Sequence, residues 1–268
     1  ETAQSTYPNS FPCFSYDERG KALIENFLPI IFFVIAFIYS TVGLGGASAY
    51  TAIMAIMGVS HHIIPTTSLA LNIAVTFFGM INYWRNGYGR LKLVGPFLIT
   101  SIPMAYIAGS LDLNENIFQT VLLLSLILVA IRIYFVDSLS FSFQLSLTKK
   151  WILTILLGST LGFTAGAVGI GGGIYLVPLI VMFGLGSEKE AAAAGTIFIF
   201  VNSLVGFVAR FQSGTFDPNF ILPLIGVVAI GGFLGSYFGS VKYDPKTIQK
   251  VMGIIIIIAI ILLAQKIL

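Results

Sequence analysis

Charged side chains are scarce in this sequence. Only 9% of its 268 residues are Asp, Glu, Lys or Arg, whereas a soluble domain carries about 25%. A surface built from so few charges could not keep a globule of this size in water, so a soluble protein is excluded. Cysteine is almost absent too, because Cys13 is the only one, and this excludes a disulfide within the chain. The net charge of +3 is small, and no basic stripe indicates binding to nucleic acid.

Apolar residues make up 57% of the chain, and they come in blocks long enough to cross a bilayer. A hydrocarbon core of about 30 Å needs a helix of about 20 residues. Eight apolar blocks are separated by polar breaks: 27–57, 64–84, 93–111, 117–136, 151–185, 191–211, 219–240 and 248–267. The sequence therefore predicts an all-α integral protein that crosses a plasma or inner cell membrane several times.

Glycines interrupt the two blocks that are too long for one span, 27–57 and 151–185. The first interruption reads Val42-Gly43-Leu44-Gly45-Gly46, and the second reads Val168-Gly169-Ile170-Gly171-Gly172-Gly173. The two motifs lie 126 residues apart. Three further landmarks recur 127 residues apart, namely Gly79 with Gly206, Gly87 with Gly214, and Pro96 with Pro223.

This spacing predicts two related halves. We expect a polar N-terminal tail at 1–26, a first transmembrane repeat at 27–136, a linker at 137–150 and a second transmembrane repeat at 151–268. Repeats on this scale are typical of secondary transporters. The alternative is chance recurrence of glycine and proline in a glycine-rich chain.

Loop charges predict how the halves are oriented, because Lys and Arg in short loops favour the cytoplasmic side. The turns at 85–92 and 242–246 and the linker are basic and are placed inside, whereas the turn at 112–115 has no cation and is placed outside. Each long block must then enter and leave on one face, as a glycine-broken helical hairpin. The fold prediction is two inverted-topology helical repeats, each with one such hairpin plus three transmembrane helices.

A helix that restarts after a break inside the membrane has free N–H donors and a partial positive charge at its N-terminus. Such an end binds anions, and two inverted copies would aim two of them at one site. The predicted substrate-binding backbone is Gly43, Gly45, Gly46 and Ala47 in the first half, with Gly169, Gly171, Gly172 and Gly173 in the second. The alternative, that these glycines only allow close helix packing, stays open.

Hydroxyl and carboxamide side chains in the next block of each half are candidates to complete this site. They are Thr66, Thr67, Ser68, Asn72 and Thr76 in the first half, and Thr196, Asn202 and Ser203 in the second. These groups can donate to an oxyanion, although hydrogen bonding between helices would explain them as well. Arg132 and Arg210 lie at span ends and are expected to reach the interface; Arg210 is also a weaker candidate for attracting an anion.

His61 and His62 are the only histidines, and they are candidates for proton coupling because their ordinary pKa is about 6.5. A plain interfacial loop is the alternative. No carboxylate lies deep in a span, and no hydrolase or zinc-protease motif indicates an enzyme. No cofactor or metal ion is expected. The expected partners are a small anionic substrate and the lipid bilayer, with a homodimer left open. Gly231, Gly235 and Gly239 form a small-residue face, most simply for packing within one subunit.

The duplicated glycine motif resembles that of the sulfite exporter TauE/SafE family of membrane permeases. The resemblance covers nearly everything after residue 27 and rests on Val168 to Gly173 with Pro178, on Thr196 and Asn202 to Gly206, and on Gly43 to Gly46, Thr67 to Leu69 and Arg85 to Gly87. Ala47 and Ala52 in the first half depart from the pattern. The resemblance implies export of sulfur oxyanions such as sulfite, sulfoacetate and other organosulfonates. Together with the anion site it predicts a secondary transporter that works by alternating access, with a passive anion channel as the alternative.

The inverted topology makes a prediction that labelling can test. Cysteines introduced into 85–92 and into 242–246 should react with a membrane-impermeant reagent from the same face, because both turns are placed inside. Labelling of the two turns from opposite faces would refute this topology.

Overall fold

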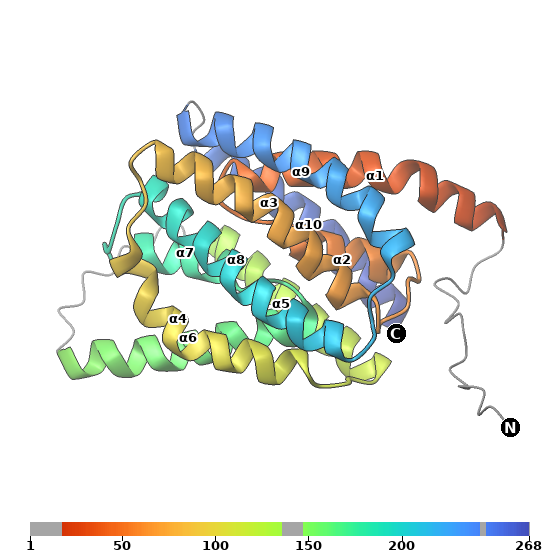
Figure 1. Cartoon of the computed structure of the whole chain (residues 1–268), viewed down its shortest axis with the longest axis horizontal. Coiled ribbons are helices and arrows are strands. Elements are labelled where there is room, and N and C mark those ends of the chain that lie inside the picture. The colour runs from red at the N-terminus through yellow and green to blue at the C-terminus, as the bar shows by residue number, and fades with distance from the viewer. Residues whose placement is uncertain (1–17, 136–146, 242–244, 268) are drawn as a thin grey trace, which may run out of the picture.

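The computed structural model describes residues 18–135, 147–241 and 245–267, and it builds them from helices and turns (Figure 1). Ten helices follow one another in these ranges: α1 (Glu18–Ser40), α2 (Ala47–Ile56), α3 (Ile64–Arg85), α4 (Leu91–Gly109), α5 (Glu115–Phe135), α6 (Leu147–Val168), α7 (Gly173–Met182), α8 (Glu188–Gln212), α9 (Pro218–Val241) and α10 (Pro245–Ile267). The predicted all-helical class is therefore confirmed.

Five of the described helices are long and apolar enough to cross a membrane. They are α3, α4, α8, α9 and, from Trp151 onward, α6. The outward side chains of the bundle are apolar, as Ile99, Leu156 and Leu222 show, each at least 59% exposed. A surface of this kind is stable against lipid and unstable against water.

Both long blocks of the sequence break into two helices at their glycines. A connection at 41–46 separates α1 from α2, and another at 169–172 separates α6 from α7. Gly43 and Gly46 have φ values of 76° and 88°, and Gly171 and Gly172 have φ values of 80° and 69°. Residues with a Cβ rarely adopt this left-handed region. The predicted interruptions are therefore real breaks of the helix.

Most of the described helices begin ahead of their apolar blocks, and α1 and α6 do so by the widest margins. α1 starts at Glu18, ahead of the predicted start of the first repeat at 27, and α6 starts at Leu147, ahead of 151. Hydrophobicity marks the part of a helix that lies in lipid, whereas polar helix formers extend the helix beyond it. The rest of the predicted tail, 1–17, and most of the predicted linker lie outside the described residues.

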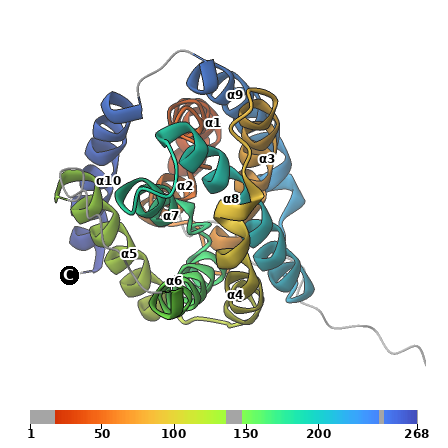
Figure 2. The ribbon, with the colours of Figure 1, turned by 90° about the vertical axis from the view of Figure 1, so that its left-hand side faces the viewer.

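The helices pack in a reciprocal pattern. α1 packs against α9 and α6 against α4, while α3 and α8 lie side by side with α9 and α4 on their flanks. α5 packs against α10. In the view along the bundle, α2 and α7 lie in its interior with the longer helices around them (Figure 2). The half-length helices that follow the glycine breaks are thus shielded from the surroundings.

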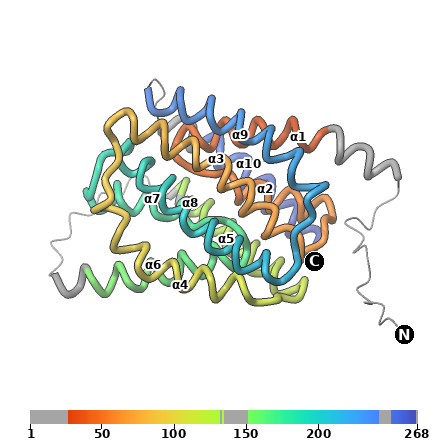
Figure 3. The backbone as a smooth tube through the Cα atoms, in the orientation of Figure 1, coloured from red at the N-terminus to blue at the C-terminus, as the bar shows by residue number. Residues whose placement is uncertain are grey.

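Polar contacts group the turns at two ends of the bundle. At one end, Arg90 Nε lies 2.8 Å from Glu190 Oε1, and Lys189 Nζ donates to the Ser240 carbonyl oxygen at 2.9 Å. We call this the basic end, and it lies at the left of the backbone tube in Figure 3. At the other end, the histidine end, His62 Nδ1 lies 3.2 Å from Asp112 Oδ1. The turn at 86–90 and the head of α8 therefore share one end.

Glycine stripes account for the closest helix pairs. In α9, a Cβ added at Gly231, Gly235 or Gly239 would meet main-chain oxygens of α1 and the turn after it, at Phe33, Phe37 and Thr41 respectively. The predicted packing role of this stripe is confirmed. A second stripe was missed: Gly158, Gly162 and Gly166 of α6 meet the carbonyl oxygens of Phe97, Ser101 and Ala105 in α4. Its four-residue spacing is the signal that could have revealed it.

We expect Gly235→Ala to lower the thermal stability of the purified protein in detergent. The new methyl group would push against the Phe37 carbonyl and Ser40 Oγ, and overpacking of this kind costs about 1–3 kcal/mol. Gly226→Ala in the same helix is the matched control, because nothing lies within 4 Å of that position. Equal melting temperatures for the two variants would contradict the tight α1–α9 contact.

Candidate functional site

The two glycine breaks meet at one side chain, Asn72 of α3. This residue is fully buried. Its Oδ1 lies where a Cβ on Gly45 would stand, and its Nδ2 lies where a Cβ on Gly171 would stand. Only glycine leaves room for the carboxamide at both positions. The structure therefore brings the predicted residues Gly45, Asn72 and Gly171 together.

The carboxamide of Asn72 is only partly satisfied by hydrogen bonds. Nδ2 donates to Ser203 Oγ of α8 across 3.4 Å, which is a long bond. Oδ1 is buried and has no hydrogen-bond partner among the described residues. A buried acceptor without a partner is costly, and only a hydrogen-bond donor of a ligand or of water could satisfy it at this break.

Both half-length helices start beside this point without a side-chain cap. Gly46 is the N-cap of α2 and Gly172 is the N-cap of α7. Neither helix has a capping hydrogen bond from a side chain or an acidic residue in its first turn. No side chain therefore caps either N-terminus or offsets its partial positive charge from the first turn.

The other polar residues predicted in α3 hold the first break in place. Thr67 Oγ1 donates to the Ile63 carbonyl at 3.0 Å, and Thr51 Oγ1 of α2 donates to Ser68 Oγ at 2.7 Å. Thr76 Oγ1 donates to the Asn72 carbonyl at 2.6 Å, and its methyl group faces Gly45. The Thr51–Ser68 bond joins α2 to α3, whereas Thr67 and Thr76 bond to carbonyls one turn earlier in their own segment.

In α8 the predicted residues divide into two groups. Ser203 Oγ contacts Asn72 and lies beside Gly171. Asn202 Nδ2 instead donates to the Phe198 carbonyl of its own helix at 2.8 Å, and Asn202 Oδ1 has no partner among the described residues. Thr196 Oγ1 likewise donates within α8, to the Ala193 carbonyl at 2.7 Å. Of the three, Ser203 is the one that contacts Asn72.

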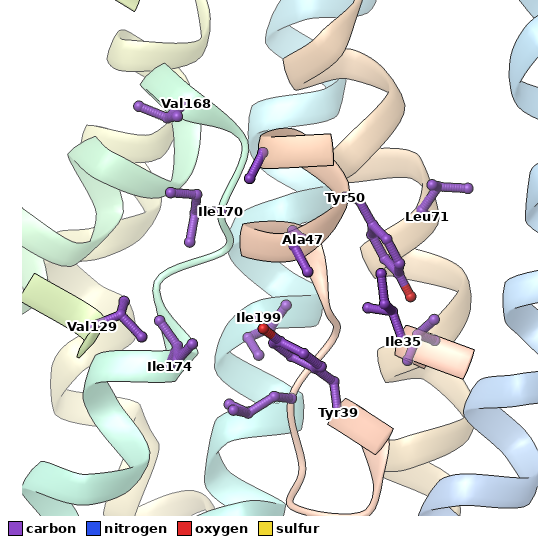
Figure 4. Close-up of a cluster of buried hydrophobic side chains, with 14 of the residues drawn as sticks. Ile35, Tyr39, Ala47, Tyr50, Leu71, Val129, Val168, Ile170, Ile174 and Ile199 are labelled. Carbon is purple, nitrogen blue, oxygen red and sulfur yellow. The ribbon is translucent and has the colours of Figure 1, made fainter. Parts of the chain in front are cut away.

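The outer glycines allow close backbone contacts on either side of Asn72. Gly43 packs against Ala192 at the head of α8, and Gly169 packs against Pro65 at the head of α3. Gly173 faces Ile199. In Figure 4, Ala47 stands at the start of α2, and Ile170 and Ile174 stand on either side of the bend before α7. Ala47 is buried, in keeping with its place in the predicted site.

The histidines lie at the histidine end, in the turn between α2 and α3. The rings of His61 and His62 are 3.9 Å apart, and His62 contacts Asp112. Partial burial and then the neighbouring His62 lower the pKa of His61, while Glu115 and Asp112 act in the opposite direction. The structure thus joins the histidines to the acidic α4–α5 turn.

Two residues with a clear structural role were missed or misplaced by sequence reasoning. Arg210 was expected to reach the interface, but it is only 6% exposed, and its guanidinium donates to the Gly166 and Ala167 carbonyls at the end of α6. Tyr83 was not singled out, yet its hydroxyl donates to the Thr41 carbonyl at 2.6 Å. The two positions lie 127 residues apart, so the repeat itself was the signal that could have paired them.

Most of the chain is similar in sequence to known membrane transporter proteins. Residues 28–263 match the family model for the sulfite exporter TauE/SafE. The chain is 31% identical over 234 residues to the probable membrane transporter protein y4hK of Sinorhizobium fredii, covering 87% of this chain and 95% of that protein. It is also 31% identical to the probable membrane transporter protein YjnA of Bacillus subtilis, covering 81% of this chain and 91% of that protein. No solved structure gives a significant match.

Gly171→Ala should destabilise the protein more than Gly184→Ala does. Both glycines have a left-handed backbone, with φ values of 80° and 63°, so both variants bear the backbone cost of about 1–2 kcal/mol. Nothing lies within 4 Å of a Cβ at Gly184, whereas one at Gly171 would displace the Asn72 amide. Thermal unfolding in detergent measures the difference. An equal or smaller loss for Gly171→Ala would contradict the close contact at Asn72.

Proposed function

Because this chain belongs to the sulfite exporter TauE/SafE family of multi-pass membrane transporters, we propose that it carries a small anion, most simply sulfite or an organosulfonate. The cargo binds between the N-termini of α2 and α7. The sulfur chemistry of the proposal comes from the family, and the preference for an anion comes from the two uncapped helix ends.

One observation carries the proposal: both glycine breaks contact the same buried carboxamide. Gly45 of the first break and Gly171 of the second stand on either side of Asn72. The unpaired Asn72 Oδ1 between the breaks is an acceptor, so a cargo that keeps an O–H group, such as hydrogen sulfite, could donate to it. An anion at this point would accept hydrogen bonds from the N–H groups of both half-length helices, without a full positive charge in the membrane centre.

We further propose that the two halves are inverted repeats and that transport works by alternating access. The reciprocal packing of α1 with α9 and α6 with α4 supports this arrangement. So does the course of the chain in Figure 1, where α1 runs away from the histidine end and α6 runs towards it. Two equivalent hairpins that enter the bundle from opposite ends would connect one break to each face of the membrane.

Coupling to protons would fall to His61 and His62 in this proposal. They sit at the histidine end beside Asp112, where a proton could be taken up before the substrate binds. Burial and the neighbouring His62 hold the pKa of His61 below its ordinary value, and its protonation at acidic pH would add positive charge on this side and favour an arriving anion.

Transport by purified protein in vesicles tests the proposal. Vesicles loaded with sulfite, or with methanesulfonate as an organosulfonate, should show saturable flux that a pH gradient accelerates. Asn72→Leu should reduce this flux at least tenfold, because it removes the polar group shared by both breaks, whereas Thr120→Leu on the exposed face of α5 should leave it unchanged. Flux that follows voltage alone and never saturates would indicate a passive channel and contradict the carrier.

A further inference from the structure

Tyr83 and Arg210 make equivalent side-chain hydrogen bonds to the main chain in the two halves. Tyr83, near the end of α3, donates to the Thr41 carbonyl just after α1 ends. Arg210, near the end of α8, donates to the Ala167 carbonyl at 2.8 Å, just before α6 ends. Donor and acceptor recur together in the two halves, so each side chain ties the long helix before a break to the central pair of helices.

The two ties lie at opposite ends of the bundle, in unlike surroundings. Tyr83 lies towards the basic end, in an apolar cluster with Ala192, Ala193 and Tyr88. Arg210 lies towards the histidine end, and its own carbonyl accepts a hydrogen bond from Thr215 Oγ1 at 3.1 Å.

A series of contacts leads from Arg210 by way of the head of α3 to the second break. Thr215 Oγ1 lies 2.6 Å from Thr66 Oγ1, at the head of α3. Pro65, the neighbour of Thr66, packs against Gly169. The first break is thus held by an apolar cluster and a neutral hydroxyl, and the second by polar contacts and a cation.

Among the described residues, no carboxylate lies within ion-pair distance of the Arg210 guanidinium. Its guanidinium donates to two main-chain oxygens, at Gly166 and Ala167. In the described parts of the chain, the ion pairs within 4.0 Å are His62–Asp112 and Arg90–Glu190, and neither includes Arg210. Asp112 acts on Arg210 only from beyond that distance. A buried cation without a countercharge is costly, and within membrane proteins such a residue commonly serves transport.

We propose that Arg210 is a second anion-binding position, on the path between the histidine end and Asn72, and that the transported oxyanion supplies its missing countercharge. The proposal rests on the function proposed above. A sulfonate, sulfite or carboxylate presents oxygens that a guanidinium binds in parallel pairs. Binding there would draw the guanidinium from the Gly166 and Ala167 carbonyls and free the end of α6, so arrival of the substrate would loosen the second break.

Kinetics of sulfite flux in vesicles test the role of the charge. Arg210→Gln should raise the KM about tenfold, since it removes a charged hydrogen-bonding partner. Arg210→Lys should fall between this variant and the wild type, because it keeps the charge and loses the paired geometry. Arg85→Gln is the matched control: Arg85 occupies the last turn of α3, as Arg210 does in α8, but it is exposed at the basic end.

A side chain that only anchors one helix to another would give a different kinetic result when it is replaced. Tyr83→Phe removes the equivalent neutral tie, and it should change kcat while leaving the KM within about twofold. If Arg210→Gln also changed kcat alone, Arg210 would be a helix anchor and the proposal would be overturned. If the wild-type protein carried neither sulfite nor methanesulfonate, the proposed function itself would fall.

Binding without transport gives a second measurement, and it remains usable if one variant folds poorly. Sulfite should raise the melting temperature of the wild type and of Arg85→Gln in detergent. The rise should be smaller for Arg210→Lys and should require about tenfold more sulfite for Arg210→Gln. An unchanged sulfite dependence in either Arg210 variant would overturn the proposal.

Discussion

The architecture depends on one constraint: a main-chain polar group inside a bilayer must find a partner within the protein. Two glycine breaks expose such groups in the interior of this bundle. At the long-helix side of each break, Tyr83 and Arg210 donate to the carbonyls of Thr41 and Ala167. At the other side, the N-termini of α2 and α7 carry no side-chain cap. At each break a carbonyl of the long helix is thus paired with a side chain, whereas the N-terminus of the following half-length helix has no side-chain cap.

Close helix packing stabilises this arrangement in the membrane. The glycine stripes of α9 and α6 bring those helices onto the carbonyls of α1 and α4, where an apolar solvent gives little driving force for helices to associate. The α9–α1 and α6–α4 pairs pack in the same way, yet the side chains of the two halves differ. Ser48 and Thr51 in α2 correspond to Ile174 and Val177 in α7, and all four are buried. The two half-length helices therefore carry unlike side chains at these positions.

Sequence reasoning succeeded where the chemistry is local. The long apolar blocks, the breaks at Gly43 to Gly46 and Gly169 to Gly173, and the packing stripe of α9 follow from residue type and spacing. It failed where a side chain acts on a distant element. Arg210 looks like an interfacial cation because it lies near the end of an apolar block, and only the position of α6 shows that it is buried. Asn202 was a candidate alongside Asn72, but its amide donates to the Phe198 carbonyl of its own helix.

The sequence by itself determined that this chain is a helical membrane protein with two interrupted helices, because hydrophobicity and glycine conformation are properties of short segments. It also placed Asn72 among the candidate site residues. Only the tertiary structure decided that Asn72 stands between both breaks, with Gly45 on one side and Gly171 on the other. That contact joins segments about 100 residues apart in sequence, and it depends on how α3 and α8 pack together, which no local pattern specifies.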